Sequence, residues 1–142
     1  YGDGINYEKY RTLIENYKLT DHVHLMGYSN NIPINEYHVG LMCSHHEAFG
    51  RVTVEYMVNG LPVIGIASGG TAEIIENKIT GYLIPVNDKV EFEKRIEELY
   101  KHREECIEMG LKGKERADKM FAEITYCQNI YDLYRQCGLL GE

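Results

Sequence analysis

Several common sequence signatures are missing from this chain, and each absence removes a class of function. No apolar run approaches the ~20 residues that a membrane-spanning helix needs, and no secretory leader is visible. The net charge is −7, and Arg51 is the single Lys or Arg between residues 19 and 77. Without a basic patch, binding to the phosphate backbone of a nucleic acid is disfavoured. We therefore expect a soluble protein that does not bind nucleic acid.

Motifs for metals and for common nucleophiles are also absent. The spacing of the four cysteines fits neither a Cys-x-x-Cys metal site nor a disulfide scaffold, so we predict reduced, buried thiols of a cytosolic protein. The sequence contains no His-x-x-x-His, Asp-x-Asp, Gly-x-Ser-x-Gly, Walker or Gly-x-Gly-x-x-Gly motif. A metal at His45-His46-Glu47 would need adjacent side chains that point together. We predict no metal and no cofactor.

Short apolar segments separated by glycine and proline dominate the first 87 residues. They have the length of strands, and the segments between them are long enough for helices. This alternation is typical of βαβ units around a parallel sheet. The predicted strands are 23–26, 39–43, 62–66 and 82–84, and the first predicted helix covers 5–18.

The pattern predicts that the C-terminal third is helical. Asp88-x-x-Glu91 resembles a capping box at the start of a helix. Apolar residues then recur at helical spacing in three successive segments, and such stripes usually face a core. Gly110 and Gly113 weaken the second of these helices. The stripe of the third consists of Ile124, Cys127, Tyr131 and Tyr134.

A polar loop that follows an apolar strand is the most informative segment. Ligands of open α/β sheets bind at the carboxyl ends of strands, where such loops lead into helices. The first amides of a helix after Gly50 lack intrahelical partners and form an anion site. Glu47 lies in the loop, and Glu55 lies about 7–8 Å beyond Gly50 along the helix axis. This layout suits a ligand with two polyol units and a phosphate between them, as in a nucleotide sugar.

Simpler interpretations of the same residues stay open. Arg51 and Glu55, four residues apart, can form an exposed ion pair of little energetic consequence. A second turn suited to an anion, Ser68-Gly69-Gly70-Thr71, precedes another predicted helix. An ordinary strand-to-helix turn also explains its two adjacent glycines.

Several ordered motifs resemble the "group 1" family of retaining glycosyltransferases, whose GT-B architecture has two Rossmann-like domains. The carboxylate pair resembles the family's Glu-x7-Glu motif, and the resemblance covers nearly the whole chain. Ala48 and Tyr56 stand where many members have Gly and Ala. The similar segments are Glu47-Ala48-Phe49-Gly50-Arg51-Val52-x-x-Glu55, Asn59-Gly60-Leu61-Pro62-Val63-Ile64, Ser68-Gly69-Gly70-x-x-Glu73, Thr80-Gly81-Tyr82-Leu83-Ile84-Pro85, Tyr1-Gly2-Asp3-Gly4 and Val23-His24-Leu25-Met26-Gly27-Tyr28.

The resemblance implies a role for each similar residue. Glu47 is implied as the catalytic residue, which binds hydroxyls of the donor sugar. Glu55 is implied to hold the ribose hydroxyls of the nucleotide. The residues implied to bind the donor sugar and phosphate are Ala48, Phe49, Gly50 and Arg51. The residues implied beside the nucleobase are Gly27 and Tyr28.

The resemblance also implies that part of the enzyme lies outside this sequence. Family members have an N-terminal acceptor domain, and their donor domain opens with a strand–helix–strand segment that carries cations for the diphosphate. We expect 1–142 to be one fragment of the donor-binding domain, with an α/β sheet region at 1–87 and helices at 88–142. Its expected fold is a Rossmann-like, three-layer α/β domain with a parallel sheet between helices. The fragment is expected to be inactive alone and able to self-associate.

The implied function of the whole enzyme is retaining transfer of a hexose-type sugar from a nucleotide diphosphate to an acceptor hydroxyl. The expected partners are the nucleotide-sugar donor and, through the missing domain, an acceptor carbohydrate or lipid-linked sugar. A cytoplasmic location is expected, with peripheral membrane contact of the full-length enzyme left open. Two alternatives also stay open: a free-standing nucleotide-sugar-binding or regulatory module, and a GT-B nucleotide-sugar 2-epimerase.

Overall fold

The computed structural model describes residues 2–139, which divide into two compact units with the boundary between Pro33 and Ile34. The first unit contains one helix, α1 (Tyr7–Asn16), close to the bounds predicted for it. Two hydrogen bonds tie the ends of this unit together. The Gly2 N–H donates to the Gly27 carbonyl oxygen at 2.7 Å, and the Tyr7 hydroxyl donates to the Leu25 carbonyl oxygen at 3.3 Å.

The predicted strand over residues 23–26 is wrong. These residues have no regular secondary structure, and the isolated bridge between Gly2 and Gly27 lies just beyond them. Val23 and Met26 are exposed. A strand is stable only when its backbone N–H and C=O groups are paired along a ladder. The apolar run is therefore present without the partner that would make it a strand.

The second unit is built on a parallel sheet with the strand order β1-β2-β3. The strands are β1 (Gly40–Met42), β2 (Val63–Ile66) and β3 (Gly81–Ile84), which confirms three of the predicted strands. Gly40 pairs with Val63, and Val63 pairs with Gly81. The helical elements are η1 (Ile34–Glu36), α2 (Arg51–Val58), α3 (Gly69–Ile74), α4 (Lys89–Lys101), α5 (Arg103–Met120) and α6 (Glu123–Gln136).

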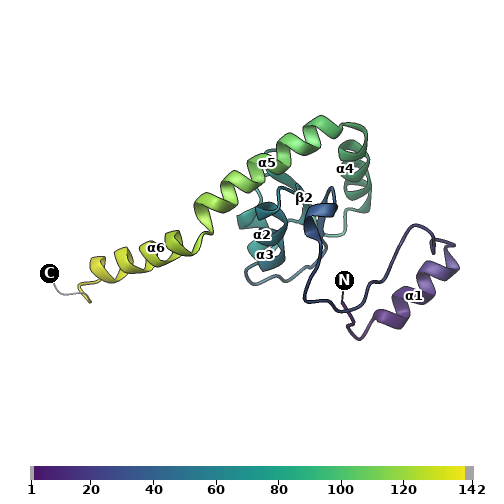
Figure 1. Ribbon diagram of the computed structural model, residues 1–142, viewed down its shortest axis with the longest axis horizontal. Coiled ribbons are helices and arrows are strands. Elements are labelled where there is room, and N and C mark those ends of the chain that lie inside the picture. The colour runs from purple at the N-terminus through teal and green to yellow at the C-terminus, as the bar shows by residue number, and fades with distance from the viewer. Residues whose placement is uncertain (1, 140–142) are drawn as a thin grey trace. The chain divides into compact units, whose positions relative to one another are not determined.

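Helices cover both faces of this sheet, as predicted (Figure 1). Successive side chains of a strand point to opposite faces, so neighbours such as Val63 and Ile64 belong to different core clusters. One cluster joins the sheet to α4 and the start of α5: Ile64, Ile66, Tyr82, Ile84, Leu99, Cys106 and Met109. The other joins it to α2, α3 and the end of α5: Met42, Met57, Val63, Ile74, Ile75 and Ala117.

Gly110 lets α5 approach the turn before β2 closely, and Gly113 lies one turn further along the same helix. A Cβ at Gly110 would overlap the Gly60 carbonyl oxygen in the turn before β2. A Cβ at Gly113 would lie 3.6 Å from Cγ of Met57, an ordinary contact. Both glycines are buried. Glycine lowers the helix propensity at position 110, but a larger residue would not fit against the Gly60 carbonyl.

The Asp88 carboxylate accepts a hydrogen bond from the Glu91 N–H at 3.0 Å, which confirms the predicted N-terminal cap of α4.

A network of charged and aromatic side chains attaches α4 to β3. The Tyr82 hydroxyl of β3 donates to Glu98 of α4 at 2.7 Å, and the Arg95 guanidinium lies 4.6 Å from the centre of the Tyr82 ring. Burial and the bond to Glu98 raise the pKa of Tyr82 to about 12.

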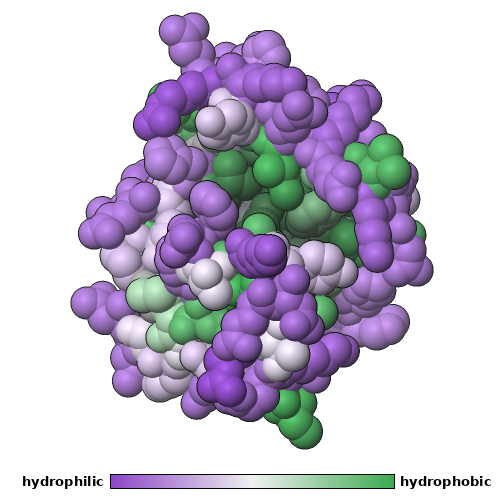
Figure 2. All heavy atoms as spheres, turned by 90° about the vertical axis from the view of Figure 1, so that its right-hand side faces the viewer, coloured by the Kyte–Doolittle hydropathy of each residue, from purple (hydrophilic) through white to green (hydrophobic). Residues whose placement is uncertain are grey.

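The prediction that the apolar stripe of α6 faces the core is wrong. No residue of α6 is buried, and Ile124 is 78% exposed. Figure 2, a view from the side opposite to α6 in Figure 1, shows hydrophobic residues among hydrophilic ones on a different face. Within residues 2–139, no helix combines the length and the apolar character required to cross a bilayer.

Candidate functional site

Two loops meet at the carboxyl edge of the sheet. Residues 43–50 lead from β1 into α2, and residues 67–68 lead from β2 into α3. Because the strands are parallel neighbours, both loops leave the same edge of the sheet. This edge is the place where ligands bind in open α/β sheets.

Gly50 directs the chain from the first loop into α2. Its φ of +90° lies in the left-handed region, which a side chain would disfavour, and the residue is buried. The Thr53 N–H donates to the Gly50 carbonyl oxygen at 2.9 Å, which closes the first turn of α2. No side chain caps this end of α2, so the N–H groups of Arg51 and Val52 have no capping partner.

The first loop is attached to the start of α3 by hydrogen bonds and by close packing. The Gly70 N–H donates to the Glu47 carbonyl oxygen at 2.8 Å, and the Ser68 hydroxyl donates to the His45 carbonyl oxygen at 2.5 Å. A Cβ at Gly69 would overlap the Glu47 carbonyl, and a Cβ at Gly70 would overlap the backbone of Phe49. The two glycines therefore support the loop that carries Glu47.

The carboxylate of Glu55 takes part in the ion pair that the simpler interpretation predicted. Arg51 Nε lies 3.5 Å from Glu55 Oε1, with the two side chains 86% and 48% exposed. An ion pair this exposed contributes about 0–1 kcal/mol to stability. It holds neither side chain firmly, so Glu55 can exchange this partner for a ligand. Glu47, in contrast, is half-buried.

The structure brings together the predicted site residues of the second unit and describes the others separately. Glu47, Glu55 and the intervening loop lie at one sheet edge; Ala48 is exposed, and Phe49 stacks edge-on against Phe121 at 6.1 Å. Gly27 and Tyr28 belong to the first unit. The Tyr28 ring is exposed, and its hydroxyl donates to Asn30 at 2.5 Å.

Sequence reasoning did not predict the environments of several groups around the loop. Cys43 follows β1 directly and is exposed, as are Cys127 and Cys137, so the predicted burial is wrong for these three cysteines. Partial burial still raises the pKa of the Cys43 thiol. Burial, followed by the nearby Glu55 carboxylate, raises the pKa of Tyr56. The hydroxyls of Thr53 and Thr71 are buried without a hydrogen-bond partner. The paired glycines at 69–70 were recognised in the sequence as a turn. Their contact with the loop that carries Glu47 could not be predicted from the sequence.

No cluster of three or more His, Cys, Asp or Glu side chains is placed to hold a metal ion within residues 2–139. The chemistry on offer consists of backbone N–H groups, two carboxylates and one exposed guanidinium. Amides at a helix start bind anionic oxygens, and carboxylates accept hydrogen bonds from hydroxyl groups. The edge is therefore equipped for a ligand that combines phosphate with polyols.

The fold defines the class: a Rossmann-like domain with an uncapped helix start and two carboxylates at the carboxyl ends of its parallel strands. Residues 1–116 match the family described as "Glycosyl transferases group 1". The chain belongs to this family and corresponds to the C-terminal domain of the GT-B fold.

Relatives and solved structures agree with this assignment. The chain is 31% identical over 135 residues to N-acetyl-alpha-D-glucosaminyl L-malate synthase of Bacillus anthracis, covering 92% of this chain and 35% of that protein. It resembles the structure of sucrose-phosphate synthase from Thermosynechococcus elongatus with a TM-score of 0.81 at 26% identity, covering 98% of this chain and 36% of the other. The pneumococcal O-GlcNAc transferase GtfA, solved with UDP and GlcNAc, gives a TM-score of 0.74 at 30% identity over 83% of this chain and 25% of the other. The chain thus spans about a third of the length of such relatives.

Proposed function

We propose that this chain is the donor-binding domain of a retaining glycosyltransferase that moves a hexose-type sugar from a nucleotide diphosphate to an acceptor hydroxyl. The observation that carries the proposal is the arrangement at the sheet edge. Two carboxylates lie on either side of the open start of α2, with Glu47 on a supported loop and Glu55 within the helix. Residues 1–142 form one donor-binding domain in this proposal, with the sheet region at 1–87 and helices at 88–142.

From sugar through diphosphate to ribose, the order of groups along the donor matches the order of groups from Glu47 to Glu55. Glu47 binds hydroxyls of the sugar, the amides that open α2 bind the diphosphate, and Glu55 binds the ribose. The residues that contact the sugar and phosphate are Ala48, Phe49, Gly50 and Arg51. The base is assigned to Gly27 and Tyr28, where the exposed Tyr28 ring offers a stacking surface.

The donor we propose is a UDP-sugar. The pneumococcal transferase, 30% identical, was solved with UDP and GlcNAc and supports both the nucleotide and the sugar. The synthase from Bacillus anthracis is named for an N-acetylglucosaminyl product and supports the sugar. UDP-N-acetylglucosamine and UDP-glucose are therefore the first donors to test. No metal is required in this proposal, because the amides at the start of a helix neutralise phosphate charge.

The chemistry rests on electrostatic stabilisation. As the bond between sugar and phosphate breaks, the sugar gains positive charge and the diphosphate gains negative charge. The Glu47 carboxylate stabilises the sugar, and the open amides of α2 stabilise the diphosphate, both more strongly in the transition state than in the ground state. The acceptor, a carbohydrate or a lipid-linked sugar, binds to a second domain of the whole cytoplasmic protein.

Substitution of the two carboxylates in the full-length protein tests the proposal. Glu55→Gln removes a contact to the ribose, which does not change during the reaction, so KM rises and kcat changes little. Glu47→Gln removes a contact that strengthens in the transition state, so kcat falls by ~10²-fold. Donor hydrolysis, followed by release of the nucleoside diphosphate, measures both constants without a known acceptor.

Both substitutions preserve size, and circular dichroism checks that each variant folds. Lys112→Gln is a matched control: Lys112 lies on α5 and pairs with Glu108 of the same helix. If Glu47→Gln leaves kcat unchanged, the sugar-site assignment is wrong. If the protein binds the donor but never breaks its glycosidic bond, a binding module is the better description.

A further inference from the structure

Arg116, in the last part of α5, is attached to the final turn of α3. Its Nε donates to the Ile74 carbonyl oxygen at 2.8 Å, and its Nη2 donates to the Glu73 carbonyl oxygen at 3.2 Å. Its Nη1 lies 3.7 Å from the Glu76 carboxylate. The last carbonyl groups of a helix lack partners within it and form the negative end of its dipole. A guanidinium at this place therefore fixes the end of α3 to α5.

The opposite end of α3 supports the loop that carries Glu47. The Gly70 N–H holds the Glu47 carbonyl oxygen at 2.8 Å, and the absence of Cβ atoms at 69–70 lets the two backbones touch. α3 has six residues, about 9 Å at ~1.5 Å per residue, so a tilt at one end displaces the other. Ile74 is buried in the core and keeps α3 packed if the polar attachment is lost.

We propose that Arg116 is a positioning residue for the Glu47 carboxylate. It sets the tilt of α3, and α3 sets the position of the Glu47 peptide through the hydrogen bond from Gly70. This inference rests on the function proposed above for Glu47. Arg116 itself binds backbone carbonyl groups at the far end of α3, so its effect on the donor is transmitted through that helix.

A double-mutant cycle in the full-length protein tests this coupling. Arg116→Met, Glu47→Gln and the double variant are compared by kcat for donor hydrolysis and by calorimetry with UDP and with the UDP-sugar that the donor test selects. We expect Arg116→Met to lower kcat about tenfold and to weaken UDP-sugar binding, with UDP binding unchanged within about twofold. In the Glu47→Gln background it has no further effect on kcat, because the displaced group is already absent.

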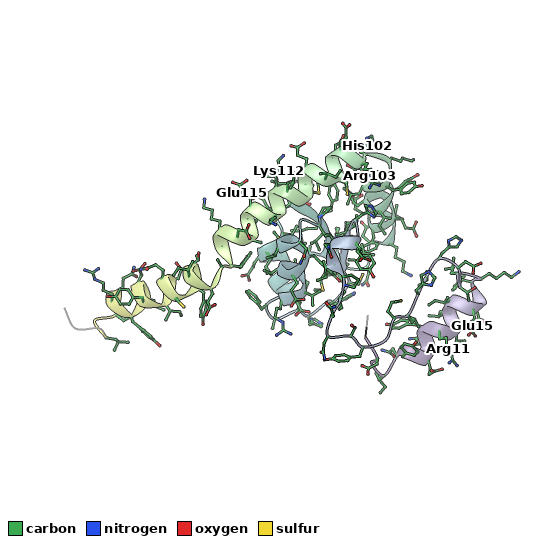
Figure 3. All side chains as sticks on the ribbon, viewed as in Figure 1. Arg11, Glu15, His102, Arg103, Lys112 and Glu115 are labelled. Atoms are coloured by element: carbon green, nitrogen blue, oxygen red, sulfur yellow. The ribbon has the colours of Figure 1, made fainter. Side chains whose placement is uncertain are left out.

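Two variants complete the experiment. Arg116→Lys keeps one charged donor to the α3 carbonyl groups and is expected to restore kcat in part. Arg103→Met is the matched control, since Arg103 lies in the first turn of α5 (Figure 3). Arg116 lies near the opposite end of this helix. Arg103 Nη2 contacts His38 Nε2 at 3.1 Å, and the control variant is expected to keep wild-type kcat.

The outcomes separate failure of this inference from failure of the proposed function. If Arg116→Met lowers kcat equally in both backgrounds, or weakens UDP and UDP-sugar binding equally, Arg116 is a general structural contact. The inference is then wrong, and the proposed function is unaffected. An Arg116→Met variant with wild-type kcat also overturns the inference. A Glu47→Gln variant with wild-type kcat overturns the proposed function, and the positioning role fails with it.

Discussion

Adding one methyl group at Gly110 is expected to destabilise the protein, although alanine is the better helix former. The new Cβ would overlap the Gly60 carbonyl oxygen and lie 3.1 Å from Cδ of Pro62. Neither neighbour is the free end of a flexible side chain, since one is backbone and the other is a buried ring. α5 must therefore move away from the turn before β2 by roughly 1 Å to relieve the contact.

Two opposing effects set the magnitude. Replacing glycine by alanine within a helix contributes about 1 kcal/mol of stability. Overpacking costs about 2–3 kcal/mol, because α5 carries buried residues into both core clusters and loses contacts in each when it is displaced. The net loss is about 1–2 kcal/mol, which corresponds to a decrease in Tm of about 3–8 °C for a chain of this size.

Gly113→Ala is the matched control on the same helix. A Cβ there would lie 3.6 Å from both Cγ of Met57 and the Thr80 carbonyl oxygen, so it fits, and the variant is expected to gain up to about 1 kcal/mol. Urea unfolding followed by circular dichroism measures both changes. The reasoning is refuted if Gly110→Ala is as stable as Gly113→Ala, because the backbone contact would then impose no cost.

Two further predictions use the titration of single groups. The raised pKa of Tyr82 means that folding favours its neutral form, so this stabilisation is complete below the unfolded pKa of ~10 and is lost as the pH rises toward 12. Tyr82→Phe should therefore cost about 1–2 kcal/mol at pH ~8 and less at pH ~11, by urea unfolding; a difference that does not shrink contradicts the assignment. Cys43 follows β1 at the sheet edge, so donor binding should slow its alkylation but not that of the exposed Cys127, as measured by mass spectrometry. Equal rates with and without donor would place the donor elsewhere.

The sheet could be predicted well because its strands are buried on both faces. Every residue of β2 is buried, and such strands read as continuous apolar runs bounded by turn residues. The same signal failed at 23–26, since an apolar run does not reveal whether a partner strand is paired with it. It failed again for α6, where a stripe of apolar residues at helical spacing lies exposed. Periodicity reports which residues can be buried, and the neighbouring elements decide whether they are.

The candidate site was predictable where it depends on spacing along the chain. Glu47 and Glu55 belong to one short segment, so the loop and the helix between them follow from local sequence. The attachment of Glu47 to Gly70 joins residues far apart in sequence, and the two glycines gave conformational freedom as their only signal. The contacts of Arg116 could not be predicted from the sequence at all, because its partners are backbone carbonyl groups that any residue at 73 and 74 would offer.

Under the proposed function, the close packing of the loop against Gly69 and Gly70 restricts how this domain can acquire a new sugar preference. A larger side chain at either glycine would push against the backbone that carries Glu47, so these positions are closed to variation. Ala48 is exposed in the same loop and has room for a change in size. Substitutions that change the choice of donor, in evolution or in a designed library, should therefore occur at exposed loop positions such as Ala48 and leave Gly69 and Gly70 unchanged.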